Sequence, residues 1–225
     1  MKNLCSSLVV CFILVTSCKN EKKSEITTPE PVQTILEKVA YAHGFENWKN
    51  VNTLKFTFNV DRDTTHFERD WIWKPKTNDV TGKSLGQTIS YNRKALDSIS
   101  TKTNSAFIND KFWLLAPYQL IWDASNFKYE HTLQAEAPIS KKQLQKLTIV
   151  YNSEGGYTPG DAYDFYFGDD YLLQEWVYRR GNQAEPSMTT TWEDYETIQG
   201  LKLAKTHKNG DGGNFKLYFS GLEVN

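Results

Sequence analysis

The sequence lacks any apolar run of the roughly 18 to 20 residues that a membrane-spanning helix needs, and its charges nearly cancel. Among 225 residues, 26 Lys and Arg oppose 27 Asp and Glu, so the formal net charge is −1. A chain so close to neutral gives no electrostatic reason to expect binding to a nucleic acid. With 39% hydrophobic and 14% aromatic residues, the composition is that of a folded globular protein.

Cysteine is also scarce, and the position of each cysteine matters. Cys5 and Cys11 lie in an N-terminal apolar segment, and Cys18 follows it closely. If that segment is removed, Cys18 is left without a partner for a disulfide or a redox pair.

Motifs for catalysis and cofactor binding are missing as well. The sequence has no G-x-S-x-G elbow, P-loop or G-x-G-x-x-G, and its histidines are far apart, at His43, His66, His131 and His207. Four acidic residues could supply a calcium site or a carboxylate pair, but most of them fall where turns favour Asx side chains: Asp161, Asp164, Asp169 and Asp170. We therefore predict no catalytic residue, no metal ligand and no cofactor.

The N-terminus has the layout of an export signal, with Lys2 before an apolar stretch from Leu4 to Val15. Val15-Thr16-Ser17-Cys18 resembles the lipobox of bacterial lipoproteins, an aliphatic residue and two small ones before a cysteine. The resemblance implies cleavage before Cys18 and acylation of that residue, which would anchor the chain to a membrane. Lys19, where other lipoproteins carry a sorting Asp, favours the outer membrane.

The predicted organisation is a signal peptide at 1–17, a lipidated flexible tether at 18–30 and a single folded domain at 31–225. The tether is rich in charge and has no apolar period. A helix is predicted after it, starting near Thr28, because apolar residues from Val32 to Ala42 recur at helical spacing. His43 should interact with the last carbonyls of this helix, and Gly44 should end it in a left-handed conformation.

Beyond the helix the apolar period changes to two, which predicts about ten or eleven strands. Short links rich in Gly, Asn and Asp favour an antiparallel meander. The strand candidates are Leu54 to Val60, Phe67 to Lys74, Asn78 to Gly82, Gln87 to Asn92, Phe127 to Leu133, Gln145 to Tyr151, Ala162 to Phe167, Leu172 to Arg179, Met188 to Tyr195, Leu201 to Lys208 and Phe215 to Leu222.

The segment from Ala106 to Leu120 breaks this pattern because it is too apolar for a surface loop. Pro117 argues against a regular helix that continues past it, so we expect one or two short helical turns inserted into the concave face of the sheet. The predicted fold class is mainly β (β+α): a strongly curved antiparallel meander forming an incomplete barrel, with an N-terminal helix and a short apolar helical plug on the concave face.

These parts together resemble the LolA/LolB (lipoprotein-localisation factor) superfamily, an incomplete barrel with helices over a hydrophobic cavity. More closely, Bacteroidota lipoproteins of unknown function are similar in four segments: Phe107 to Pro117, Thr158 to Asp161, Glu175 to Tyr178 and Thr191 to Tyr195. The superfamily resemblance implies binding of an acyl chain or another apolar ligand. Fold analogy alone is weak evidence of function.

Alternation places several aromatic residues on one face of the sheet, as in apolar binding sites. The predicted ligand-binding residues are Phe56, Phe58, Trp71, Trp73, Trp113, Tyr163, Phe165, Trp176 and Tyr178; the alternative is that they only fill the core. Arg179 and Arg180 could face a polar head group or could simply be exposed charges. We predict a lipid-anchored envelope protein that binds a lipid or an acyl chain without catalysis. An envelope hydrolase using carboxylates and a histidine, or a structural partner in an envelope complex, are the alternatives.

Overall fold

The computed structural model describes residues 32–210 and 212–225. The chain divides into a segment Met1–Val32 and a compact unit Gln33–Asn225, and this unit contains its own hydrophobic core. The predicted signal peptide, the tether with Cys18, and the helix start at Thr28 lie outside the described residues. Among the described residues, no helix is both long and apolar enough to cross a membrane.

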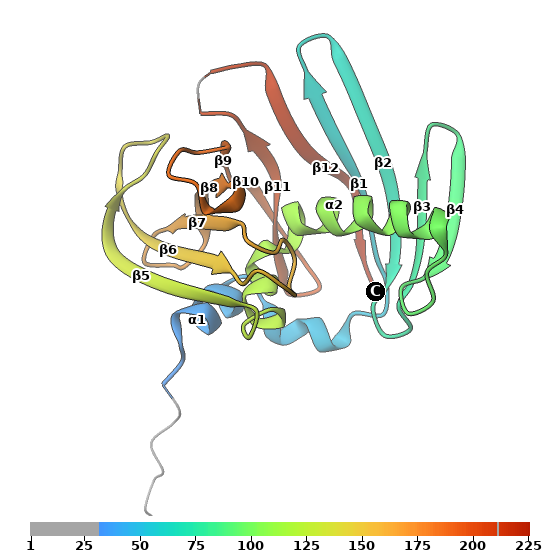
Figure 1. Ribbon diagram of the computed structural model, residues 1–225, viewed down its shortest axis with the longest axis horizontal. Helices are drawn as coiled ribbons and strands as arrows, with labels where there is room; N and C mark the ends of the chain where they lie inside the picture. Colours follow the sequence, from blue (N-terminus) through green and yellow to red (C-terminus); the bar gives the residue numbers. More distant parts are fainter. Residues whose placement is uncertain (1–31, 211) are drawn as a thin grey trace, which may run out of the picture. The chain divides into compact units, whose positions relative to one another are not determined.

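The described residues form twelve strands in two antiparallel sheets (Figure 1). The seven-stranded sheet has the order β10-β11-β12-β1-β2-β3-β4, with strands β1 (Leu54–Arg62), β2 (Thr65–Lys74), β3 (Asp79–Ser84), β4 (Gln87–Asn92), β10 (Glu193–Ile198), β11 (Leu201–Lys208) and β12 (Phe215–Val224). The five-stranded sheet has the order β5-β6-β7-β8-β9, with strands β5 (Phe127–Glu136), β6 (Gln143–Tyr151), β7 (Ala162–Phe167), β8 (Leu173–Arg179) and β9 (Met188–Thr191). The predicted fold class is confirmed, with open antiparallel sheets and few helices.

The chain passes from one sheet to the other at Trp192. We expected one strand from Met188 to Tyr195, but its first half pairs in the five-stranded sheet and its second half in the seven-stranded one. The Trp192 N–H donates to the Gln174 carbonyl at 2.7 Å, and Thr190 bridges to Asn209 at the end of β11. Trp192 is buried, so its indole packs where the two sheets meet.

The N-terminal helix α1 (Ile35–Ala42) begins later than expected. Thr34, not Thr28, is its N-cap, because Thr34 and Glu37 form a reciprocal capping box that satisfies two backbone N–H groups. At its other end, His43 is the C-cap and Gly44 is left-handed with φ 85°, as predicted. A 3-10 helix, η1 (Phe45–Asn50), follows directly.

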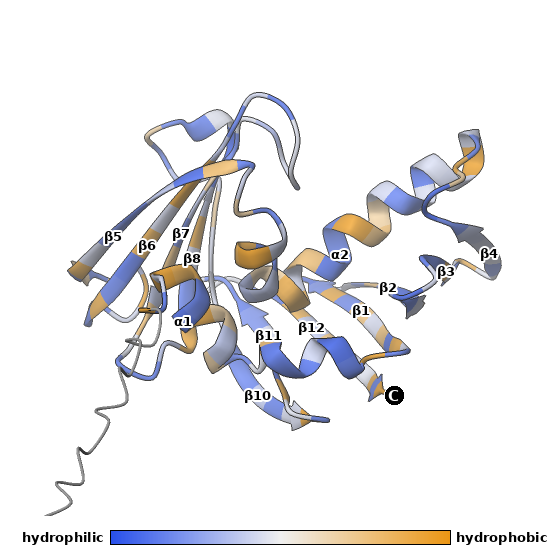
Figure 2. Cartoon of the chain, turned by 90° about the horizontal axis from the view of Figure 1, so that it is seen from below, coloured by the Kyte–Doolittle hydropathy of each residue, from blue (hydrophilic) through white to orange (hydrophobic). Residues whose placement is uncertain are grey.

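The predicted plug is part of a much longer helix, α2 (Ser98–Trp122). Our expectation of one or two short turns was wrong because the helix starts in a Ser- and Thr-rich stretch of low helix propensity. Asp97 provides the start signal, since its carboxylate accepts from the Ser100 N–H at 2.7 Å. Figure 2 shows that α2 is most apolar beyond its first turns.

Pro117 bends α2 instead of ending it. Proline has no N–H to donate to the carbonyl four residues earlier, and its ring crowds that carbonyl, here Trp113. The backbone relieves the crowding at Leu115, which leaves helical geometry at φ −120° and ψ 20°. Both sides of the bend are buried, so packing holds the interrupted helix together.

Helix α2 packs against both sheets and forms the centre of the core. The Phe107 ring lies 5.3 Å from Trp71 and 5.5 Å from Trp73, both on β2. Further along, the Trp113 ring lies 4.6 Å from Trp176 on β8. All these side chains are buried, and aromatic side chains of this size dominate core energetics.

Truncating Phe107 to Ala should lower the free energy of unfolding by about 3–5 kcal/mol, because a fully buried aromatic ring is removed from between two tryptophans. The matched control is Ile99→Ala on the same helix, where the side chain is 65% exposed and the expected change is within about 0.5 kcal/mol. Denaturant unfolding of Gln33–Asn225 measures both. Equal losses for the two variants would contradict the placement of α2.

Candidate ligand-binding groove

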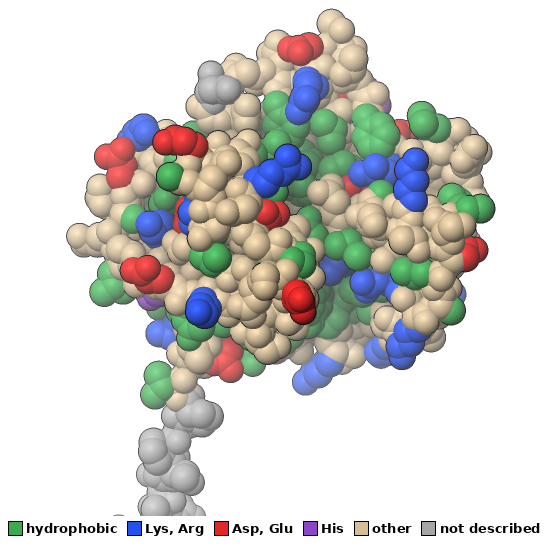
Figure 3. Space-filling view, viewed as in Figure 1, with side chains coloured by type: hydrophobic (Ala, Val, Ile, Leu, Met, Phe, Trp, Pro, Cys, Tyr) green, Lys and Arg blue, Asp and Glu red, His purple; other side chains and the backbone are tan. Residues whose placement is uncertain are grey.

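Two depressions open beside α2, and Figure 3 shows hydrophobic side chains in the hollowed centre of this face. The aromatic depression, about 440 Å³, lies between the two sheets and is lined by Val60, Arg62, Asn109, Phe112, Trp113, Tyr157, Thr158, Tyr163, Trp176, Tyr178, Arg180, Met188, Phe215 and Leu217. The hairpin depression, about 610 Å³, lies between α2 and β2–β4 and is lined by Phe67, Arg69, Trp71, Gly82, Lys83, Ser84, Leu85, Gln87, Ile89, Ser98, Ile99, Lys102, Thr103 and Ala106. Both volumes are typical of small-molecule sites.

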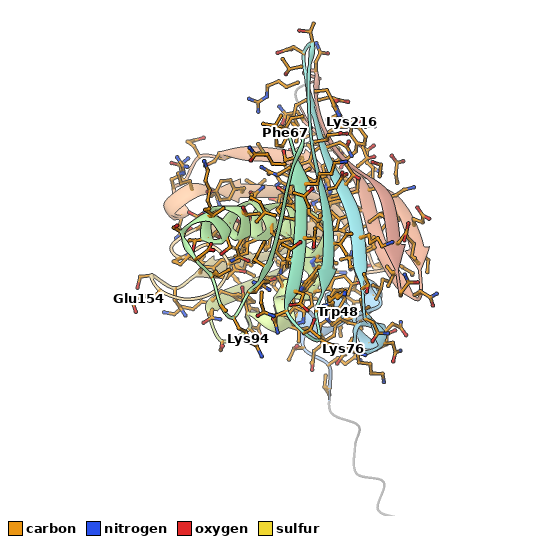
Figure 4. All side chains as sticks on the ribbon, turned by 90° about the vertical axis from the view of Figure 1, so that its right-hand side faces the viewer. Trp48, Phe67, Lys76, Lys94, Glu154 and Lys216 are labelled. Carbon is orange, nitrogen blue, oxygen red and sulfur yellow. The ribbon has the colours of Figure 1, made fainter. Side chains whose placement is uncertain are left out.

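The two depressions lie side by side, lined by successive residues of α2 and by neighbouring positions of the seven-stranded sheet. On α2 their lining residues recur every three or four positions, which places them on one helix face: Ile99, Thr103, Ala106, Asn109 and Trp113. On the sheet, Val60 is the cross-strand partner of both Phe67 and Leu217, so these three side chains point to the same side. Phe67 lies at the end of the sheet opposite Trp48 (Figure 4). We call the two depressions together the groove.

Aromatic rings form most of the wall of the aromatic depression. Tyr157 comes from the loop between β6 and β7 and stacks on Phe112 of α2, with ring centroids 3.7 Å apart. Tyr163 lies beside both rings, and its hydroxyl shares a 3.1 Å hydrogen bond with Thr158. Burial raises the pKa of Tyr157 and of Tyr163 above the ordinary value. Both phenols are therefore uncharged at physiological pH, so this wall is neutral and largely apolar.

A buried ion pair fixes α2 to the sheet where the two depressions meet. Arg69 donates to both carboxylate oxygens of Asp110, at 2.7 and 2.6 Å, and the Trp71 indole N–H donates to the same carboxylate at 2.8 Å. Burial raises the pKa of Asp110, and the hydrogen bonds and charge of Arg69 oppose that rise. The pair is far apart in sequence, so no local pattern could have predicted it.

Gly82 on β3 makes room for the Trp71 ring in the hairpin depression. The two residues are cross-strand partners, and a Cβ at Gly82 would overlap the ring. The absence of a side chain at Gly82 therefore lets the indole lie flat on the strand and reach Asp110.

The structure divides the nine predicted aromatic residues into two groups. Those lining the groove are Trp71, Trp113, Tyr163, Trp176 and Tyr178. The other four are buried and line neither depression: Phe56, Phe58, Trp73 and Phe165. Phe56 and Phe58 pack against Phe219, and Phe165 lies behind Trp176. The same alternation thus produced both core residues and groove residues.

The acidic residues proposed as an alternative ligand set hold loops and strands in place. Asp161 accepts from the Tyr178 hydroxyl at 2.9 Å and from the Gly181 N–H at 2.7 Å. Asp164 accepts from Thr148 at 2.6 Å and pairs with Arg179 at 3.1 Å. Within residues 32–210 and 212–225, no group of three His, Cys, Asp or Glu side chains is placed to hold a metal ion.

The histidines are likewise held in structural contacts. His43 is fully buried and contacts the Val39 carbonyl at 2.8 Å and the Tyr195 hydroxyl at 3.1 Å; burial lowers its pKa to about 4. His207 is also fully buried, contacts the Thr191 carbonyl at 3.1 Å, and has its pKa lowered to about 3 by burial. His66 pairs with Asp61 at 2.6 Å on the exposed β1–β2 hairpin, outside the lining of the groove.

Lys111 is a buried amine on the other side of α2. Its Nζ lies 4.9 Å from the Trp122 ring centroid and 5.6 Å from that of Trp73, and it donates to the Gln119 amide oxygen at 3.0 Å. Burial lowers its pKa to about 7, from 10.5. No local pattern predicts a buried amine here, because a lysine is normally expected at the surface.

Replacing Lys111 by Met should stabilise the domain by about 1–4 kcal/mol near pH 7, because an apolar side chain of similar length avoids the burial of an amine. In the wild-type domain the unfolded chain binds more protons at this site between pH 7 and 10.5, so Lys111 makes stability fall as pH drops through that range. Lys111→Met should remove this part of the slope. Unfolding at several pH values measures it, with exposed Lys102→Met as the control. A loss of stability at every pH would show that the contacts with the indoles outweigh burial.

Comparison with known proteins yields structural similarity only. No protein-family model and no curated protein matches this chain. Among solved structures, it is similar to a LolA superfamily protein of Nitrosomonas europaea (TM-score 0.47, 9% identity, covering 85% of this chain and 92% of that one). It is also similar to a DUF1329 family protein of Desulfovibrio piger (TM-score 0.45, 10% identity, 84% and 92%) and to MucB (TM-score 0.26, 9% identity, 84% and 57%). The Nitrosomonas europaea protein belongs to the superfamily that this sequence resembles. Likeness at this level carries no functional conclusion for this chain.

Proposed function

We propose that this domain is a non-catalytic binding module for the acyl chain of a lipid or lipoprotein, held at the cell envelope by an acylated Cys18. The observation that carries the proposal is the aromatic depression, a space of about 440 Å³ that opens to the surface and is lined by aromatic side chains continuous with the hydrophobic core. Burying hydrocarbon there is favourable by about 0.8 kcal/mol per CH₂. Roughly eight methylenes would therefore contribute about 6 kcal/mol against the cost of association.

The shape of the groove suits a long chain better than a compact ligand. Its wall on α2 runs from Ile99 to Trp113, and at a rise of about 1.5 Å per residue that is roughly 21 Å. Val60 and Phe67 provide an apolar surface between the two depressions. An acyl chain in the aromatic depression could thus extend along α2 towards the β2–β4 hairpins.

A fluorescent long-chain fatty acid should bind Gln33–Asn225 with micromolar or better affinity and quench tryptophan emission, since Trp113 and Trp176 line the aromatic depression. Val60→Glu places a charge at the middle of the groove and should weaken binding at least tenfold, because a buried unpaired charge is costly. Ile72→Glu is the matched control, because this residue is exposed on the neighbouring strand and faces the opposite side. Absence of binding by the folded wild-type domain, checked by circular dichroism, would overturn the proposal.

Cys18→Ser should abolish lipidation, because a hydroxyl does not replace the thiol that accepts the diacylglyceryl group. The basis is the Val15-Thr16-Ser17-Cys18 sequence. Metabolic labelling with a fatty acid, followed by membrane fractionation, measures the effect, with Cys11→Ser as the control in the same N-terminal segment. A labelled and membrane-bound Cys18→Ser protein would refute the anchor.

One observation favours a second role at the same surface. Leu85 and Ile99 line the hairpin depression and are 92% and 65% exposed. Large exposed apolar side chains at the edge of a groove are typical of surfaces that contact a membrane or a protein. Contact of this edge with an envelope partner is the second candidate, and it is compatible with the first.

A further inference from the structure

Two arginines reach the aromatic depression from different sheets. Arg62 ends β1, and Arg180 begins the short 3-10 helix η2 (Arg180–Asn182) after β8; both line the depression and both are exposed. Among the described residues, neither guanidinium forms an ion pair with a carboxylate. Figure 3 shows Lys and Arg side chains around the hollow on this face.

Two of the nearby carboxylates have other partners. Asp61, next to Arg62, pairs with His66 at 2.6 Å. Asp161 lies behind the aromatic wall and accepts from Tyr178 and from the Gly181 N–H. Arg179, next to Arg180, pairs with Asp164 and donates to Asn182 at 2.9 Å. Arg179 is therefore held by these contacts, whereas Arg180 lies close to the Tyr178 hydroxyl, which itself lines the depression.

The positions of both arginines are restrained by their surroundings. The Arg62 guanidinium lies 5.6 Å from the centroid of the Phe215 ring, which itself lines the depression. The backbone around Arg180 is held by its own N–H, which donates to Ser187 at 2.9 Å, and by Gly181, which donates to Asp161 at 2.7 Å. Guanidinium groups present paired donors that match carboxylate and phosphate oxygens.

We propose that the ligand of the aromatic depression is an anionic amphiphile, whose carboxylate or phosphate head is held by Arg62 and Arg180 and whose hydrocarbon tail lies against the aromatic wall. This inference rests on the proposed binding function and adds the charge and orientation of the ligand. The head stays at the solvent edge, where the arginines are. The tail points inward, towards Trp113 and Trp176.

The test compares a long-chain fluorescent fatty acid with the matching fatty alcohol, using Gln33–Asn225 at pH 8, where the carboxylate is ionised. The wild-type domain should bind the acid about three- to tenfold more tightly, since two exposed charge contacts are worth roughly that much. The preference should shrink in high salt. Arg62→Gln/Arg180→Gln should abolish the preference, because it should weaken binding of the acid about three- to tenfold more than binding of the alcohol.

The matched control is Lys83→Gln/Lys102→Gln, which removes the same charge from the hairpin depression and should keep the preference for the acid. Equal affinity of the wild-type domain for acid and alcohol would overturn this inference while leaving the proposed function intact. Binding of neither probe would overturn the proposed function itself. Loss of the preference in the lysine pair, or its retention in the arginine pair, would show that the head is held elsewhere.

Discussion

The position of α2 across the inner faces of the two sheets is the constraint on which the rest of the structure depends. Asp110 is the key residue, because its buried carboxylate accepts from Arg69 and Trp71 on β2 as well as from its neighbour Asn109. Removing one partner of such a pair leaves an uncompensated buried charge, which is strongly destabilising. The interaction therefore sets the rotation of the helix as well as its place. With that rotation, Phe107 faces β2 and Trp113 faces β8.

The groove follows from which side chains this rotation turns towards the sheet. The helix carries large buried side chains from Phe107 to Trp113. Its adjoining face carries the short side chains of Thr103, Ala106 and Asn109, which line the groove. Short side chains cannot fill the distance to Phe67 and Val60, so space remains there. The same helix is thus a plug on one face and the wall of a groove on the other.

Local pattern predicts the strands of this fold well and its helix poorly. Alternation and turn residues predict most strand boundaries, because both signals come from residues that are neighbours in the chain. The start of α2 depends on a cap at Asp97 followed by Ser and Thr, and the helix is held by tertiary contacts that override propensity. Trp192 likewise looks like the middle of one strand, since nothing local marks it as the crossing between sheets.

For single residues of the candidate site, too, local sequence pattern predicts only part of the structure. Alternation identifies which side of a strand is apolar, and that suffices to select Tyr163, Trp176 and Tyr178. It does not say how far α2 reaches over that side, and this is what separates Trp71 in the groove from Trp73 beneath the helix.

Arg62 ends a strand of one sheet and Arg180 follows a strand of the other, so only the folded chain brings these two cations to one apolar opening. The buried phenols remain neutral, and Asp161 is occupied by Tyr178 and Gly181. The charge at the edge of the depression is therefore positive and the wall behind it apolar. A positive edge next to an apolar wall favours a ligand that is anionic at one end and apolar at the other. Neither the aromatic wall nor the two arginines would make that selection alone.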